Sequence, residues 1–118
     1  MISIPSEDVD TLDETAQVTI FTEVIAWAAE AYPDLFDGAR APSTLELIQR
    51  SIARAHELEI DAVFDVIRFV DLVIRCGEDF ESRPRFLGLG RTLAQTAVPG
   101  AVRLDIVESI LRRRTAKR

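Results

Sequence analysis

Apolar residues recur along the chain at spacings of three and four, the period of an amphipathic α-helix, and no alternating run is long enough to predict a strand. The residues TLDE, Thr11 to Glu14, form a capping box that predicts a helix start near Thr11. Pro33 should end this helix, because proline cannot continue the helical hydrogen bonding. Its apolar stripe comprises Val18, Phe21, Val24 or Ile25, Ala28 and Tyr32.

A second capping box, from Ser43 to Glu46, predicts the next helix, which should fade near Leu58. Its stripe is Leu45, Ile48, Ile52 and Ala55. Asp61 is the expected cap of a third helix, which is apolar on more than one side and should be the most buried of all. Its predicted inward face is Phe64, Ile67, Val70 and Ile74, and its further apolar positions are Val63, Val66, Phe69 and Val73.

Glycine and proline mark the boundaries of the last two helices. Gly77 fits the left-handed position that closes the third helix, and a short fourth helix is predicted from about Pro84 to Thr96. Pro99 suits the first turn of a fifth helix, with Arg112, Arg113 and Arg114 in its last turn. Its expected inward residues are Val102, Ile106 or Val107, and Ile110.

These elements predict an all-α protein, a single compact bundle of four or five helices with the third helix buried at its centre. We expect one domain over residues 1–118, with residues 1–10 and 115–118 frayed. Trp27, beside the main stripe of the first helix, is predicted to be a core residue, and a homodimer contact is its alternative.

Charge is unevenly distributed along the chain, which carries a net charge of −6. Residues 1–39 hold nine acids and no Lys or Arg, whereas residues 81–118 hold nine bases and three acids. An internal head-to-tail contact is the simpler interpretation, and a charged partner is the other. The net negative charge of the chain argues against nucleic-acid binding by the terminal residues RRRTAKR. We interpret these residues as a solvated helix end.

The cellular compartment follows from what the sequence lacks. One cysteine cannot form an internal disulfide, which favours a reducing compartment. The N-terminal residues MISIPSEDVD do not resemble a secretory signal, and no apolar run reaches the roughly 20 residues of a membrane helix. We therefore expect a soluble, cytoplasmic protein with no membrane partner.

The residues with candidate chemistry have simpler structural explanations. Cys76 is expected to be a small, inert, apolar residue, and His56 a partly exposed residue with no special task. Glu78, Asp79 and Glu81 include paired carboxylates of the kind used in acid–base catalysis, but solvated loop charges are the favoured interpretation. We predict no catalytic, cofactor or metal site, and a small enzyme built on His56 and Cys76 is the least favoured alternative.

The stretch RCGEDFESRP, Arg75 to Pro84, raises the choice between an active-site loop and a structured turn between two helices. The longer segment RFVDLVIRCGEDFESRP resembles that of small all-helical proteobacterial proteins encoded in type VI secretion gene clusters, beside spike proteins and effectors. Their common pattern is aromatic-(Val/Ile)-Asp-Leu, a Gly-acid-Asp-Phe turn, and then Pro. The matching positions here include Phe69, Asp71, Gly77, Phe80 and Pro84, and the likeness spans roughly residues 18–114.

The resemblance implies a non-enzymatic protein–protein interaction module. Its expected partner is a secreted effector or a spike component, and the expected role is that of an adaptor or accessory chaperone for effector loading. An immunity protein that neutralises a cognate toxin is the alternative, since an acidic body suits a basic toxin. In either role we expect a structured helix–loop–helix corner, in which Phe80 tucks under the third helix as an apolar anchor. Asp71 is expected to pair with Arg68, Arg75 or an arginine of the corner. The predicted partner-binding residues are Glu78, Asp79, Phe80, Arg83, Arg85 and Phe86.

Overall fold

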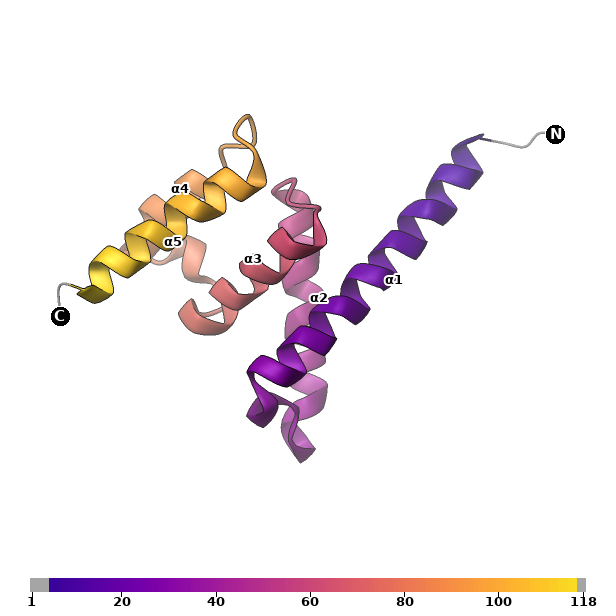
Figure 1. The fold of residues 1–118 in the computed structure, drawn as a ribbon, viewed down its shortest axis with the longest axis horizontal. Coiled ribbons are helices and arrows are strands. Elements are labelled where there is room, and N and C mark those ends of the chain that lie inside the picture. The colour runs from indigo at the N-terminus through magenta and orange to yellow at the C-terminus, as the bar shows by residue number, and fades with distance from the viewer. Residues whose placement is uncertain (1–4, 117–118) are drawn as a thin grey trace. The chain divides into compact units, whose positions relative to one another are not determined.

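The computed structural model of the chain describes the backbone of residues 5–116 and the side chains of residues 18–114. This part of the chain is all-α, as predicted, with no strand (Figure 1). None of its helices is both long enough and apolar enough to span a membrane. The α-helices are α1 Pro5–Ala31, α2 Ala41–Glu57, α3 Val63–Cys76, α4 Leu87–Leu93 and α5 Gly100–Ala116. Four short 3-10 helices connect them: η1 Pro33–Phe36, η2 Gly38–Arg40, η3 Phe80–Ser82 and η4 Pro84–Phe86.

Contacts between residues divide the chain into two compact units, Met1–Ile48 and Gln49–Arg118, with the boundary inside α2. The single domain over 1–118 and the fraying of 1–10 and 115–118 stay predictions, and part of both predicted frayed ends lies outside the described residues.

Helix α1 starts earlier than its sequence pattern predicts. It begins at Pro5 rather than near Thr11, because a proline with its fixed backbone angle is compatible with a first helical turn. It ends at Ala31, and the predicted stop at Pro33 is confirmed. The side chains of the capping box lie outside the described residues. Val24 and Ala28 are buried as expected, but Val18 is 64% exposed, so its predicted inward position is wrong.

Helix α2 also starts early, at Ala41, because η2 runs directly into it and places Ser43 inside the helix. Its buried positions follow a stripe that differs slightly from the predicted one. Ile48 and Ala55 are fully buried as expected, whereas Leu45 is exposed. Thr44 is buried instead, and its hydroxyl donates a hydrogen bond to the carbonyl of Leu35. Polar residues that can find such a partner are tolerated inside, which a hydrophobicity pattern does not reveal.

Helix α3 carries more buried apolar residues than any other helix of the second unit, as predicted. They are Val66, Phe69, Val70, Leu72 and Val73. Phe64 was expected to face inward but is 72% exposed. Asp61 does not cap the helix, since the N-cap position is Ala62 and has no side-chain cap. The Asp61 carboxylate instead lies 2.8 Å from Nδ1 of His56.

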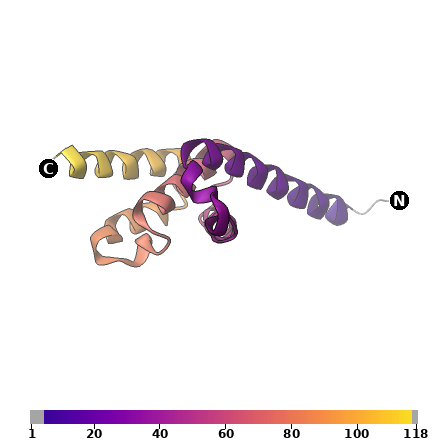
Figure 2. The same cartoon turned by 90° about the horizontal axis from the view of Figure 1, so that it is seen from below.

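The C-terminal half is built from α4 and α5, which contact each other, and α5 also contacts α3 (Figures 1 and 2). Helix α4 is shorter than predicted, ending at Leu93, and the residues from Pro84 to Phe86 form a separate 3-10 turn. Helix α5 begins directly after Pro99. Leu104 and Val107 are its fully buried apolar residues, whereas Val102 and Ile106 are over 40% exposed. The predicted inward position of Val102 is therefore wrong, and of the alternatives Ile106 and Val107 it is Val107 that faces inward.

Arg103 determines which face of α5 turns inward, and its side chain is only 1% exposed. Its Nε donates to the carbonyl of Val98 at 2.8 Å, and its Nη1 donates to the carbonyls of Leu58, at 2.8 Å, and Leu93. The last two carbonyls lie at the C-terminal ends of α2 and α4, where the helix dipoles concentrate negative charge. A buried cation is stable here because three backbone acceptors replace its lost hydration.

Candidate functional site

The candidate site is the corner, residues Gly77–Phe86, which joins α3 to α4. It begins where α3 ends at Cys76, with the N–H of Gly77 donating to the carbonyl of Val73 at 2.8 Å. Gly77 has φ 106° and ψ 149°. The predicted stop is confirmed, but the conformation is extended with positive φ rather than left-handed helical. That region is accessible essentially to glycine alone, so the chain can leave the helix in this direction only at a glycine.

Three phenylalanines hold the corner from inside. Phe80 is completely buried, and its ring centroid lies 6.2 Å from those of both Phe69 and Phe86. The ring of Phe86 meets Phe80 edge-on, an arrangement that aromatic pairs prefer. The expectation that Phe80 is an apolar anchor is thus confirmed. A side chain in this position supports the surface from below and is not itself available to a partner.

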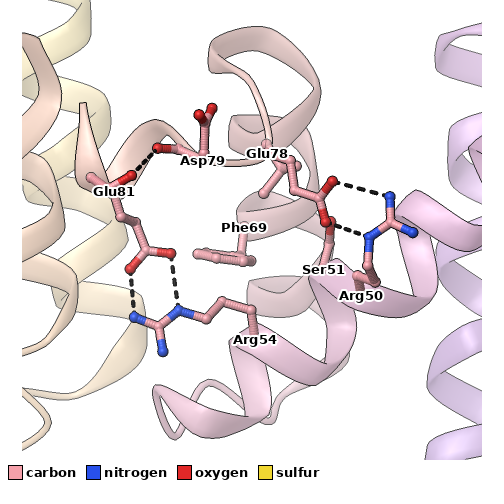
Figure 3. A pocket seen from close by; sticks show the side chains of 9 residues that line it. Arg50, Ser51, Arg54, Phe69, Glu78, Asp79 and Glu81 are labelled. Atoms are coloured by element: carbon pink, nitrogen blue, oxygen red, sulfur yellow. Dashed lines mark hydrogen bonds and ion pairs between the residues drawn. The ribbon is translucent and has the colours of Figure 1, made fainter.

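Two arginines of α2 hold the rim of the corner through forked ion pairs (Figure 3). Both nitrogens of Arg50 that face Glu78 donate to its two carboxylate oxygens, with Nη2–Oε1 at 3.0 Å. Arg54 binds Glu81 in the same way, at 3.1 and 2.8 Å. The two arginines are four residues apart and so lie on the same face of α2. From this face each arginine reaches one of the two glutamates of the corner. Bidentate pairs of this kind fix orientation as well as distance.

These pairs change the ionisation of the groups that form them. The hydrogen bond from Arg50 lowers the pKa of Glu78, and the hydrogen bond to Glu81 raises the pKa of Arg54. Asp79 is engaged too, since Arg83 lies 2.8 Å from its carboxylate. The interpretation of these acids as solvated loop charges is therefore too simple. Each of the three carboxylates has an arginine partner, and for Glu78 and Glu81 this partner lies in α2, where no signal near the corner in the sequence indicates it.

A cavity of about 280 Å³ lies between the two forked pairs, with Phe69, Val73 and Ser51 among its lining residues (Figure 3). Its three carboxylates, Glu78, Asp79 and Glu81, all belong to ion pairs. The hydrogen bond from Arg50 lowers the pKa of Glu78, which makes this carboxylate a poorer proton acceptor. The charged residues around this cavity therefore have a structural role, which is to hold the corner against α2.

A second cavity, of about 270 Å³, has a different character. It is lined by Arg75, Cys76, Arg83, Arg85, Phe86, Leu111 and Arg114. Burial raises the pKa of the Cys76 thiol, while the positive charges of Arg75 and Arg85 act in the opposite direction. The net effect favours the neutral thiol, which agrees with the inert role predicted for Cys76. We call this cavity the arginine pocket.

Ion pairs between α3 and α5 position one wall of the arginine pocket. Arg75 bridges Asp71, at 3.0 Å, and Glu108, at 2.9 Å. The expected pairing of Asp71 with a nearby arginine is thereby confirmed, with Arg75 as the partner. Arg68 makes a similar link to Asp105 at 2.7 Å.

His56 and the acidic residues near it do not come together as a metal site. The imidazole is exposed, and its Nδ1 lies 2.8 Å from Oδ1 of Asp61. Within the described residues, no group of three or more His, Cys, Asp and Glu side chains is placed to hold a metal ion.

The Arg50–Glu78 pair predicts a pH-dependent contribution to stability. Because folding lowers the pKa of Glu78 from its ordinary value of 4.5, the contribution is full above that pH. It is lost as the pH falls through the lower pKa of the folded state. Glu78→Gln should therefore reduce the free energy of unfolding by about 0.5 kcal/mol at pH 7, a small value because both side chains are about half exposed.

Urea unfolding of Glu78→Gln and wild type at pH 7 and pH 3 measures this difference. Glu46→Gln is the control, because Glu46 is exposed on the same helix as Arg50 and has no ion pair among the described residues. An equal loss for Glu78→Gln at both pH values would contradict the ionic origin of the effect.

Among known proteins, no family model, no curated protein and no solved structure matches the chain. The resemblance to proteins of type VI secretion clusters therefore stays a prediction, based on the residues from Phe69 to Pro84.

Proposed function

We propose that the chain is a non-enzymatic protein–protein interaction module associated with a type VI secretion effector. In this role it acts in the bacterial cytoplasm as an adaptor or accessory chaperone for effector loading. The proposal combines the sequence resemblance with the build of the corner. The residues that carry the resemblance, from Phe69 to Pro84, are also those that form this corner.

The observation that carries the proposal is the fixed geometry of the corner. Phe80 supports it from inside, and the pairs of Glu78 with Arg50 and Glu81 with Arg54 hold its rim. A rim held in this way presents charged groups in a defined arrangement before any partner arrives. Preorganisation of this kind favours binding, because less side-chain freedom is lost in the complex.

Of the predicted partner-binding residues, Arg85 is the most suited to direct contact, since it is exposed and has no ion pair among the described residues. Glu78, Asp79 and Arg83 are exposed too but already belong to ion pairs. Phe80 can contribute only through the packing of the corner, and Phe86 is 7% exposed. The partner-binding role of the set remains a prediction.

An immunity protein is the second candidate, and the net charge of −6 favours it. An acidic protein attracts a basic toxin over long distances, which speeds association and suits rapid neutralisation. Both candidates bind an effector, but they have opposite consequences for its activity.

The test is to purify a toxic effector encoded in the same gene cluster and to measure complex formation and toxin activity at equimolar ratio. The adaptor role predicts a stable complex in which the toxin remains active. Loss of toxin activity in a tight complex would replace it with the immunity role. Absence of any complex with the effector or with the spike component would overturn both.

The control variant is His56→Ala, which removes the exposed imidazole and leaves the corner unchanged. Both binding roles predict that this variant forms the complex as the wild type does. A variant that binds normally but lacks function in secretion would support the enzyme alternative.

A further inference from the structure

We propose that the arginine pocket binds carboxylate side chains of an acidic peptide segment on a protein partner. The inference rests on the proposed interaction function and specifies the chemistry of one contact. It draws on the arginines of the pocket and their partners, on the aromatic wall beside them and on the size of the cavity.

The arginines of the pocket are not equally neutralised. Arg75 pairs with Asp71 and Glu108, and Arg83 pairs with Asp79. Arg85 and Arg114 have no carboxylate within ion-pair distance in the part of the chain that the structure describes. The positive excess of the pocket therefore comes from these two residues, one in η4 and one in the last turn of α5.

Phe86 places both guanidinium groups against the same aromatic wall. The Cζ atoms of Arg85 and Arg114 lie 5.3 and 5.9 Å from the centroid of its ring. Arg114 also donates from Nη1 to the carbonyl of Arg85 at 2.9 Å, which links the two elements. Among the described residues, the bond from Nη1 of Arg114 is the one hydrogen bond that either guanidinium donates, so several N–H donors of each remain for a ligand. Such donors match the two oxygens of a carboxylate.

The pocket is small and partly apolar. Its volume of about 270 Å³ lies just below the usual range of small-molecule sites, so it suits one or two side chains of a peptide. Phe86 and Leu111 exclude water from one side, and an ion pair formed beside apolar groups is stronger than one in open solvent.

An acidic peptide fits these features better than a nucleic acid does. Nucleic-acid sites extend over a basic surface and engage a run of phosphates, whereas this chain carries a net charge of −6. Within the arginine pocket, the unneutralised charge belongs to two arginines around one cavity. A single acidic cluster on a protein surface would satisfy both.

Cys76 provides a reporter for occupancy, because it lines the pocket and is the single cysteine of the chain. The experiment measures its alkylation by iodoacetamide, a neutral reagent, in the full chain at fixed ionic strength. The probe is an acetylated and amidated six-residue peptide with three acidic residues and one phenylalanine. The matched peptide carries Gln and Asn in place of the acids.

The acidic peptide should slow alkylation of Cys76 by about three- to tenfold at saturation, because it covers the thiol and its negative charge disfavours the thiolate. The amide peptide should have no effect. The double variant Arg85→Gln and Arg114→Gln should lose the protection. The control double variant Arg91→Gln and Arg112→Gln, which removes the same charge from exposed positions outside the pocket, should keep it.

Thermal melts confirm that each variant folds, and Arg85→Gln alone is a milder second variant that should lose part of the protection. Three results would overturn the proposal: equal protection by both peptides, equal protection by inorganic phosphate, or protection by a single-stranded oligonucleotide but not by the acidic peptide. An effector complex that the pocket variant forms as well as wild type would also refute it, while leaving the interaction function intact.

Discussion

Replacing Arg103 with alanine should lower the free energy of unfolding by about 3–5 kcal/mol, which is a large part of the stability of an ordinary domain. The guanidinium is buried and donates to three carbonyl oxygens, those of Leu58, Leu93 and Val98. Alanine leaves all three without this donor and opens a cavity in the same place. An unsatisfied buried acceptor costs about 1–3 kcal/mol, so the losses at the three carbonyls alone account for the expected size.

Arg103→Lys separates the contribution of charge from that of geometry. A lysine keeps the charge, but it carries its donors on one nitrogen and cannot reproduce contacts made from both Nε and Nη1. We expect it to lose about 1–3 kcal/mol, less than alanine does. Arg103→Met fills most of the volume without a donor and should be nearly as damaging as alanine.

The measurement is urea unfolding followed by circular dichroism, with Arg91→Ala as control. Arg91 is exposed in α4 and has no hydrogen-bond or ion-pair partner among the described residues, so its loss should change stability by less than about 0.5 kcal/mol. If Arg103→Ala and Arg91→Ala were equally stable, the guanidinium of Arg103 would not be the buried link between these helix ends.

Gly90→Ala should lower the free energy of unfolding by about 1–3 kcal/mol, the largest loss that we expect at a position other than Arg103. A Cβ atom at this position would lie 2.8 Å from the backbone oxygen of Glu81 and 3.3 Å from its Cα. These atoms belong to η3, which the buried ring of Phe80 and the Arg54–Glu81 pair hold in place. The strain therefore cannot be relieved by rotating a side chain, and α4 must move away from the corner.

Gly88→Ala provides the matched comparison in the same helix. No atom outside its immediate surroundings lies within 4 Å of its added Cβ. Alanine should therefore stabilise the protein by about 0.5–1 kcal/mol, through higher helix propensity and a less flexible unfolded chain. The two substitutions are chemically identical, so the opposite signs isolate the close approach of α4 to the corner. Equal melting temperatures for the two variants would show that this approach is looser than 2.8 Å implies.

The candidate site could be predicted from the sequence in part. The helix stop at Gly77, the buried anchor Phe80 and an arginine partner for Asp71 were all expected and are present. The ion pairs of Arg50 and Arg54 were not expected, because their glutamate partners are 28 and 27 residues away in the chain. The arginine pocket was missed for the same reason, since Arg114 and Phe86 meet only after α5 has folded back on α4.

The sequence by itself determined the all-α class, the C-terminal ends of α1 and α3, and the burial of α3. These features depend on residues close together in the chain, whose propensities act before any long-range contact forms. The tertiary structure alone decided which face of α5 turns inward. The local expectation was an apolar stripe through Val102, Ile106 or Val107, and Ile110, and Val107 is indeed buried. In place of Val102, however, the helix buries the cation Arg103, on which the carbonyls of Leu58, Leu93 and Val98 converge. Burial of a charge depends on hydrogen-bond acceptors from segments that are distant in the sequence, and a local pattern of apolar residues does not reveal these acceptors.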